Sequence, residues 1–357
     1  MPIPIETVAR YVRDFLGVDV DSKNPKISYI AAISDSVGDA RDILLKHHMK
    51  EILYSHTEHF GLHEYYPPFF LLPRGNSPIR DHLVFYEPSL DDPVSQICTW
   101  GQIQGDIFDR INFLLGQGDN CGRKQWEWCF IYRVLERLNF LRPGKRGLGF
   151  AVGQEPLPSA FVAAGCDILA TDAPPEALSE TGYLSSAEYL SCIDQINLQG
   201  LCDPQFLEEH LVFQPVDMND IPNEMDNSFD YCWSSCAFEH LGSIEAGLSF
   251  VLNSLKTLRP GGIAIHTTEF NVSSNTSTFV SPELSIFTME HIENLMVMAI
   301  KRGYEIEPLN FFPGSASEDL CYQTFPYSYN VPKLDIQGNI CTSIGLVIRK
   351  VAEVINV

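Results

Sequence analysis

The first residues that could bind a ligand lie at a glycine-rich turn between a buried strand and a helix. Gly149 and Gly153 stand at this corner, and a carboxylate, Asp172, ends the next buried strand. Glycine lets backbone N–H groups approach a ligand closely, and a carboxylate at the second strand's end can accept hydrogen bonds from both hydroxyls of a ribose. The pattern predicts a nucleotide-type cofactor site. A strand–glycine–helix corner that binds nothing is the alternative.

The third expected strand also ends in groups suited to such a cofactor. Its last residues are Asp217, which can bind an exocyclic amine, and Met218, which can pack against a purine face. A solvated turn is the alternative, because Asp, Asn and Pro are turn formers and all occur in VDMNDIP. Because three successive strands end in groups suited to such a cofactor, we favour the binding site over the solvated turn.

These residues need a sheet to bring them together. From Arg146 onward, strands of near-continuous apolar content alternate with helices, which predicts a mostly parallel sheet covered on both faces. The expected strands are 147–152, 166–171, 211–217, 229–235, 261–270, 304–310 and 340–350, and the expected helices are 126–141, 156–165, 243–258 and 288–303.

This arrangement resembles the class I (Rossmann-like) S-adenosylmethionine-dependent methyltransferases. The resemblance rests on the glycine corner, Asp172, Asp217, FDYCWSSCAFEHL and LKTLRPGGIAIHTTEF, of which LxxLRPGG is the most specific part. It covers roughly residues 124–351. It implies an α/β fold with a doubly wound, seven-stranded, mostly parallel sheet, and S-adenosylmethionine as the cofactor. A dinucleotide dehydrogenase explains only the corner and the first acid.

The resemblance also assigns the cofactor loop, with two departures from the family's pattern. Aligned on Gly153, Gly147 stands where the family has an acid, and Ala151 replaces its middle glycine. Glu155 is the natural substitute for the missing acid, unless it is only a charge at a helix start. Ala151 is tolerable if its φ stays negative. The cofactor-binding set is then Gly147, Gly149, Ala151, Gly153, Glu155, Asp172, Asp217, Met218 and Ser234.

Methyl transfer to an alcohol or amine requires removal of a proton, so a base is expected near the ends of the fourth and fifth strands. The candidates are His240, His266 and Glu269. His240 is favoured because histidine can accept a proton near neutral pH. The alternatives are that His240 orders its loop through a hydrogen bond and that His266 is a satisfied core residue.

The resemblance divides the chain into a mainly helical N-terminal extension, residues 1–120, and a methyltransferase domain, residues 121–357. The extension is expected to help form the acceptor site. The acceptor is expected to be a small molecule or glycan precursor, methylated on oxygen or nitrogen. A protein methyltransferase and a non-catalytic interaction protein of the same fold are the alternatives.

Composition limits the partners. The formal net charge of -22 argues against a nucleic-acid partner, because such binding depends on clustered Lys and Arg. We expect no membrane partner and a cytoplasmic location, since neither a signal peptide nor an apolar span is recognisable. We also expect no metal, because His56, His59 and His63 do not form an HExxH-type motif.

Overall fold

The computed structural model describes residues 4, 6, 9, 10, 62–72, 77–174, 195–325, 327 and 330–351. The strands are β1 Leu62–Glu64, β2 Leu83–Val84, β3 Ser95–Ile97, β4 Arg146–Phe150, β5 Asp167–Asp172, β6 Leu211–Pro215, β7 Phe229–Ser235, β8 Leu258–Asn271, β9 Tyr304–Ile306, β10 Leu309–Asn310, β11 Cys321–Gln323, β12 Leu334–Ile336 and β13 Asn339–Lys350. The α-helices are α5 Trp100–Ile103, α6 Asp106–Leu114, α7 Arg123–Arg137, α8 Leu157–Ala163, α10 Pro204–His210, α11 Ile244–Ser254 and α12 Met289–Lys301. Short 3-10 helices include η7, Phe238–His240.

The described strands form one sheet, in the order β1-β11-β12-β13-β8-β7-β4-β5-β6, with the remaining strands attached beside it. Strands β6, β5, β4, β7 and β8 are parallel neighbours, whereas β13 runs antiparallel to β8 and β9 antiparallel to β13. The predicted alternation of mostly parallel strands and helices is confirmed. The sheet is nevertheless mixed and has 13 strands, because short strands extend it beyond the seven that were expected.

The N-terminal part of the chain takes part in the same sheet. Strand β1 pairs with β11, and β3 pairs with both β10 and β13. The described residues before 120 therefore contribute strands as well as α5 and α6, so a mainly helical extension is not confirmed. His56 and His59 lie outside the described residues, and His63 lies in β1.

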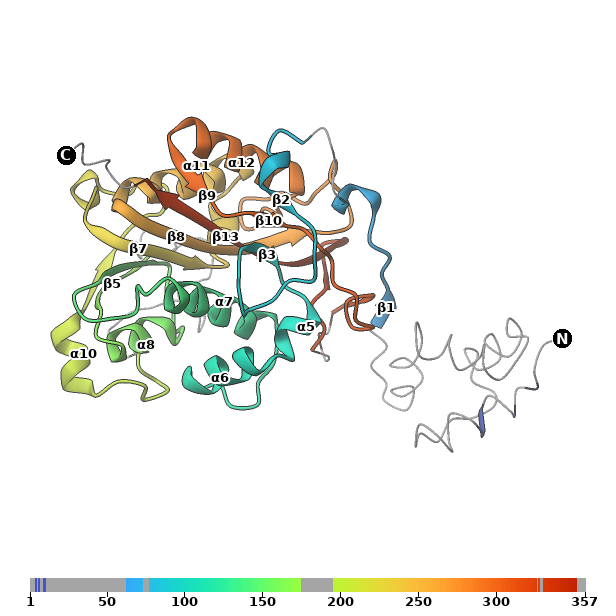
Figure 1. Cartoon of the computed structure of the whole chain (residues 1–357), viewed down its shortest axis with the longest axis horizontal. Coiled ribbons are helices and arrows are strands. Elements are labelled where there is room, and N and C mark those ends of the chain that lie inside the picture. Colours follow the sequence, from blue (N-terminus) through green and yellow to red (C-terminus); the bar gives the residue numbers. More distant parts are fainter. Residues whose placement is uncertain are drawn as a thin grey trace.

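Helices cover both faces of the sheet (Figure 1), and a separate core fills each face. The core under α11 and α12 includes Cys232 and Phe250, whereas the core under α6, α7 and α8 includes Tyr231 and Trp233. Successive residues of β7 thus point to opposite faces, as a strand buried on both sides requires. None of the described helices has the length and apolar content needed to cross a membrane.

The parallel register brings the carboxyl ends of five strands to one edge. Gly149 of β4 pairs with Ala170 of β5 and with Trp233 of β7, and Ser235 of β7 pairs with Thr267 of β8. The segments that leave these strands therefore lie side by side. In open α/β sheets, ligands bind at this edge.

Candidate active site

Two of the predicted carboxylates lie at this edge, on neighbouring segments of the chain. Asp172 ends β5, and its carbonyl oxygen accepts a hydrogen bond of 2.8 Å from Val216 N, one residue before Asp217. Asp217 is half-buried and caps its own turn by accepting from Asn219 N at 2.8 Å. Met218 is 6% exposed and packs within the core. Strand pairing alone thus places both acids together.

Asp172 is tied to the glycine corner that precedes it by a helix and a strand. Its Oδ2 accepts from Gly153 N at 3.2 Å, and its Oδ1 accepts from Ala173 N at 2.8 Å. Asp172 is 5% exposed. A carboxylate offers about four acceptor positions, so one that holds the loop can also receive hydroxyl donors. The residues at this corner therefore fit a ribose-containing cofactor.

Two glycines of the motif have a packing explanation that the sequence did not reveal. A Cβ at Gly147 would lie 2.5 Å from the Tyr231 ring, and one at Gly149 would lie 2.5 Å from the Trp233 ring. Both separations are far shorter than van der Waals contact. Two aromatic rings of β7 therefore require glycine here, so close approach to a ligand is not needed to explain Gly147 and Gly149.

The middle position of the loop does not meet the condition under which alanine would be tolerated without strain. Ala151 has a φ of 48°, not a negative φ. Val152 N bonds to Thr171 O at 3.0 Å directly after it, and Gly153 also has a positive φ, of 50°. A left-handed conformation costs a non-glycine residue roughly 1–2 kcal/mol. The surrounding hydrogen bonds hold Ala151 in this strained turn.

Glu155 is neither exposed nor a simple helix-start charge. It is 6% exposed, and its Oε1 accepts a 2.6 Å hydrogen bond from Trp233 Nε1. Burial raises the pKa of Glu155 to about 8, although the bond from Trp233 opposes this shift. Trp233 packs directly against Gly149, so the hydrogen bond from Trp233 to Glu155 helps to fix the glycine corner in place.

His266 and Ser234 belong to the core. The Ser234 hydroxyl lies 2.8 Å from His266 Nδ1, and the Ser254 hydroxyl lies 3.0 Å from Nε2. Ser254 donates its own proton to Val251 O, so Nε2 carries the imidazole hydrogen and Nδ1 accepts from Ser234. Both His266 and Ser234 are 0% exposed, and burial lowers the pKa of His266 to about 3. The assignments of His266 as a base and of Ser234 as a cofactor ligand are therefore corrected: these side chains satisfy each other.

His240 lies in η7 with an exposed side chain. Its Nδ1 is 2.5 Å from the carbonyl oxygen of Glu283, to which it must donate. This contact ties two loops together, as the alternative interpretation required. It also selects the tautomer whose lone pair is on Nε2, the form that can accept a proton.

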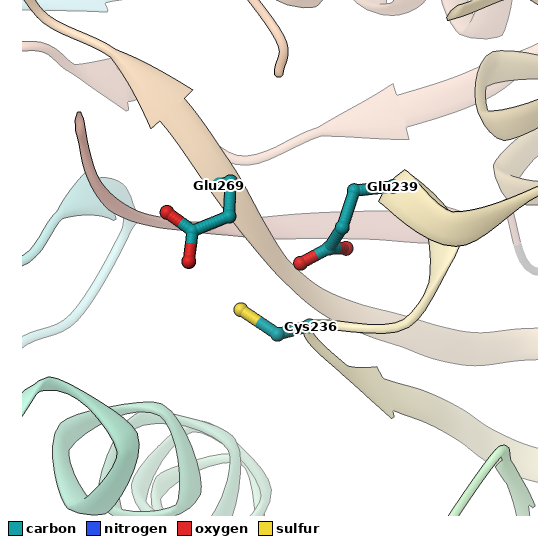
Figure 2. A group of neighbouring side chains, drawn as sticks. All are labelled: Cys236, Glu239 and Glu269. Atoms are coloured by element: carbon teal, nitrogen blue, oxygen red, sulfur yellow. The ribbon is translucent and has the colours of Figure 1, made fainter. Parts of the chain in front are cut away.

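A cluster of charged side chains lies where β7 and β8 end. Arg123 Nη1 and Nη2 donate to Glu269 Oε2 and Oε1 at 2.5 and 2.6 Å. These two side chains are only 14% and 11% exposed. Burial raises the pKa of Glu269, and Arg123 opposes the rise. Beside this ion pair, Cys236 Sγ and one oxygen each of Glu239 and Glu269 all lie within 4.8 Å of one another (Figure 2).

Glu127 of α7 joins the cluster to β7 and β13. Its carboxylate accepts from Lys124 Nζ at 3.0 Å, Ser235 Oγ at 3.3 Å, Cys236 Sγ at 3.0 Å and Ser343 Oγ at 2.5 Å. Burial opposes ionisation, yet the neighbouring lysine and arginine lower the pKa of Glu127. The Glu127 carboxylate is therefore negatively charged and fully hydrogen-bonded.

The sequence interpretation did not identify Arg123, Lys124, Glu127 or Cys236 as site residues. A signal was present on α7, where Arg123 and Glu127 are one helical turn apart and Glu127 borders the apolar stripe of Trp126 and Phe130. Ionisable residues beside a buried stripe must find charged partners. The identity of those partners could not be read from the chain.

Comparisons with known proteins give similarities of fold. No protein-family description and no curated protein matches the sequence. Among solved structures, phosphoethanolamine N-methyltransferase 2 of Haemonchus contortus is 20% identical, over 56% of this chain and 42% of its own, with a TM-score of 0.35. The methyltransferase domain of bacterial CtHen1-CN is 14% identical, over 64% and 100%, with a TM-score of 0.40. A SAM-dependent methyltransferase from Aquifex aeolicus is 12% identical, over 62% and 89%, with a TM-score of 0.34.

All three solved proteins are methyltransferases by description. This chain spans less than half of the Haemonchus contortus protein. At these identities and TM-scores the similarity does not establish an activity.

Proposed function

We propose that this protein is an S-adenosylmethionine-dependent methyltransferase that methylates an oxygen or nitrogen of a small molecule or glycan precursor. The observation that carries the proposal is the edge of the sheet. There the Asp172 carboxylate binds the backbone of the glycine corner, with Asp217 next to it along the same edge. A nearly buried polar cluster around Glu269 follows at the ends of β7 and β8. The part of the edge around Asp172 and Asp217 suits a nucleoside, and the cluster around Glu269 suits a polar acceptor.

S-adenosylmethionine, when bound, supplies a methyl group on a positively charged sulfur. The protein's contribution is to hold the two reactants and exclude water. Asp172 would hold the ribose hydroxyls, and Asp217 the base. Gly153 would offer its backbone to the cofactor, and Glu155 would keep the corner rigid through Trp233.

For the proton of the acceptor, His240 is the candidate that we retain. His266 is fully buried between two serines, and both oxygens of Glu269 are held by Arg123. The His240 ring is exposed, and its tautomer leaves the Nε2 lone pair as the basic position.

The N-terminal extension would contribute to the acceptor side. Tyr65 donates a 2.8 Å hydrogen bond to the carbonyl oxygen of Val272, just beyond the end of β8. Residues near β1 therefore lie close to the edge that carries Glu269. The strongly acidic chain favours a small acceptor over nucleic acid.

Replacing Asp172 by alanine should weaken binding of S-adenosylhomocysteine by roughly 1.5–3 kcal/mol, the range of charge-assisted hydrogen bonds. Isothermal titration calorimetry measures this loss, and a thermal melt checks that the variant folds. Asp167→Ala is the matched control, because Asp167 begins the same strand at the opposite edge of the sheet. Equal affinities of the two variants for S-adenosylhomocysteine would show that Asp172 does not bind the cofactor. Absence of any binding to the wild type would contradict the proposed function.

Replacing His240 by alanine should reduce turnover on the order of 100-fold, the usual contribution of a general base. Binding of S-adenosylhomocysteine should remain, because the predicted cofactor groups lie on other strands. His210→Ala is the control, since His210 precedes β6 at the opposite edge and bonds to Asp167 at 2.8 Å. If His240→Ala kept near-normal turnover from pH 6 to 8, another group or solvent would remove the proton.

A further inference from the structure

The cluster of Cys236, Glu239 and Glu269 has the composition of a metal site. One thiol and two carboxylates converge, with all three ligand atoms within 4.8 Å of one another (Figure 2). Cys236 and Glu239 come from the segment after β7, and Glu269 comes from β8. Thiolate and carboxylate oxygen are both ligands of zinc, and three protein ligands with one open position are typical of its catalytic sites.

A second observation points to a missing partner at the same place. Glu239 is 1% exposed, and its Oε2 accepts from Thr268 Oγ1 at 3.0 Å. Within the described part of the chain, nothing donates a hydrogen bond to Glu239 Oε1, which is buried. A buried carboxylate oxygen without a partner is costly, and a bound cation would satisfy it.

The charges around the cluster favour a cation. Glu127, Glu239 and Glu269 contribute three carboxylates, whereas Arg123 and Lys124 contribute two positive charges. One negative charge is left over when the Cys236 thiol is protonated, and two when it is ionised. A divalent cation would balance the second state.

The surroundings also resemble those of a metal site. Arg123 fixes the Glu269 carboxylate, and each carboxylate oxygen has a second lone pair for a metal. Cys236 has a positive φ of 47°, and its N–H bonds to Thr267 O at 3.0 Å and Thr267 Oγ1 at 3.1 Å. Strained backbone of this kind, held by its neighbours, occurs often at functional sites.

We propose that Cys236, Glu239 and Glu269 bind one divalent cation of the zinc class, with a fourth position left open. The metal site lies in the same cluster that the proposed function assigns to the acceptor, but metal binding does not require methyl transfer. It also replaces the expectation from the sequence that no metal is bound. On binding, the Cys236 S–H bond breaks, its sulfur forms a bond to the metal, and the proton passes to the buffer.

The test is a titration of the metal-free protein with zinc chloride, in the absence of S-adenosylmethionine. Isothermal titration calorimetry should show one site, with about one proton released when two buffers of different ionisation enthalpy are compared. Cys236→Ser and Glu239→Gln should each weaken this binding by at least about tenfold. Cys121→Ser is the control for binding at other thiols, because Cys121 is also partly exposed and is not among the three ligands.

A spectroscopic measurement keeps the test decisive if a variant folds poorly. Cobalt(II) bound to the wild type should give a thiolate-to-metal charge-transfer band, which Cys121→Ser keeps and Cys236→Ser loses. Magnesium, which prefers oxygen ligands, should not compete. Absence of zinc binding, or binding unchanged in Cys236→Ser and Glu239→Gln, would overturn the site.

Discussion

Replacing Arg123 by methionine should lower the free energy of unfolding by about 3 kcal/mol at pH 7. Methionine fills much of the arginine's space but leaves the nearly buried Glu269 side chain, 11% exposed, without its ion-pair partner. Breaking a buried pair on one side costs roughly 3–5 kcal/mol, and we expect the lower end because both groups retain some exposure. Denaturant unfolding of the two proteins measures the difference.

The pH dependence identifies the cause. Burial already raises the pKa of Glu269, and loss of Arg123 raises it further. The folded variant then keeps a proton that its unfolded chain releases, so its deficit is largest at neutral pH and shrinks as pH falls toward the ordinary glutamate range. The double variant Arg123→Met/Glu269→Gln should recover part of the loss.

An exposed pair with the same geometry provides the control. Arg110 donates to both oxygens of Glu136 at 2.8 and 2.6 Å, but its side chain is 47% exposed. Arg110→Met should therefore cost less than about 1 kcal/mol. Equal effects of Arg110→Met and Arg123→Met would contradict a buried, structurally important pair.

The parallel part of the fold was predictable because its strands can be recognised from the residues of each strand alone. Strands buried on both faces must be apolar nearly throughout, and β4, β5, β7, β8 and β13 all show such runs between turn residues. The short strands β1, β2, β3, β11 and β12 were not predictable. Two or three residues show no periodicity, and β1, β2 and β3 pair with β11, β10 and β13, which are far away in the sequence.

The site was predictable only for residues whose position follows directly from the order of the strands in the sheet. Asp172 and Asp217 end neighbouring strands, so the expected sheet was enough to bring them together. The Arg123–Glu269 pair joins positions 146 residues apart, and Glu127–Ser343 joins positions 216 apart. Such contacts depend on how α7 packs across the sheet. His266 was misassigned because alternation along β8 does not reveal a serine on each side of its ring.

Replacing Glu155 by glutamine should remove a pH dependence from the stability of the protein. An unfolded glutamate titrates near pH 4.3, whereas burial raises the pKa of folded Glu155 to about 8. Between these values the unfolded chain releases a proton that the folded chain keeps. The free energy of unfolding of the wild type therefore falls as pH rises, by up to about 1.4 kcal/mol per pH unit.

Glutamine has no such proton, and its amide oxygen can still accept the hydrogen bond from Trp233 Nε1. The stability of Glu155→Gln relative to the wild type should therefore increase by about 3 kcal/mol between pH 5 and pH 8. Denaturant unfolding of both proteins at several pH values measures this change, and groups common to both cancel. Glu245→Gln is the matched control, because Glu245 is an exposed acid in the first turn of α11 and its replacement should change stability by less than about 1 kcal/mol. Parallel stability curves for the wild type and Glu155→Gln would show that Glu155 ionises freely, which is incompatible with a buried acid bonded to Trp233 behind the glycine corner.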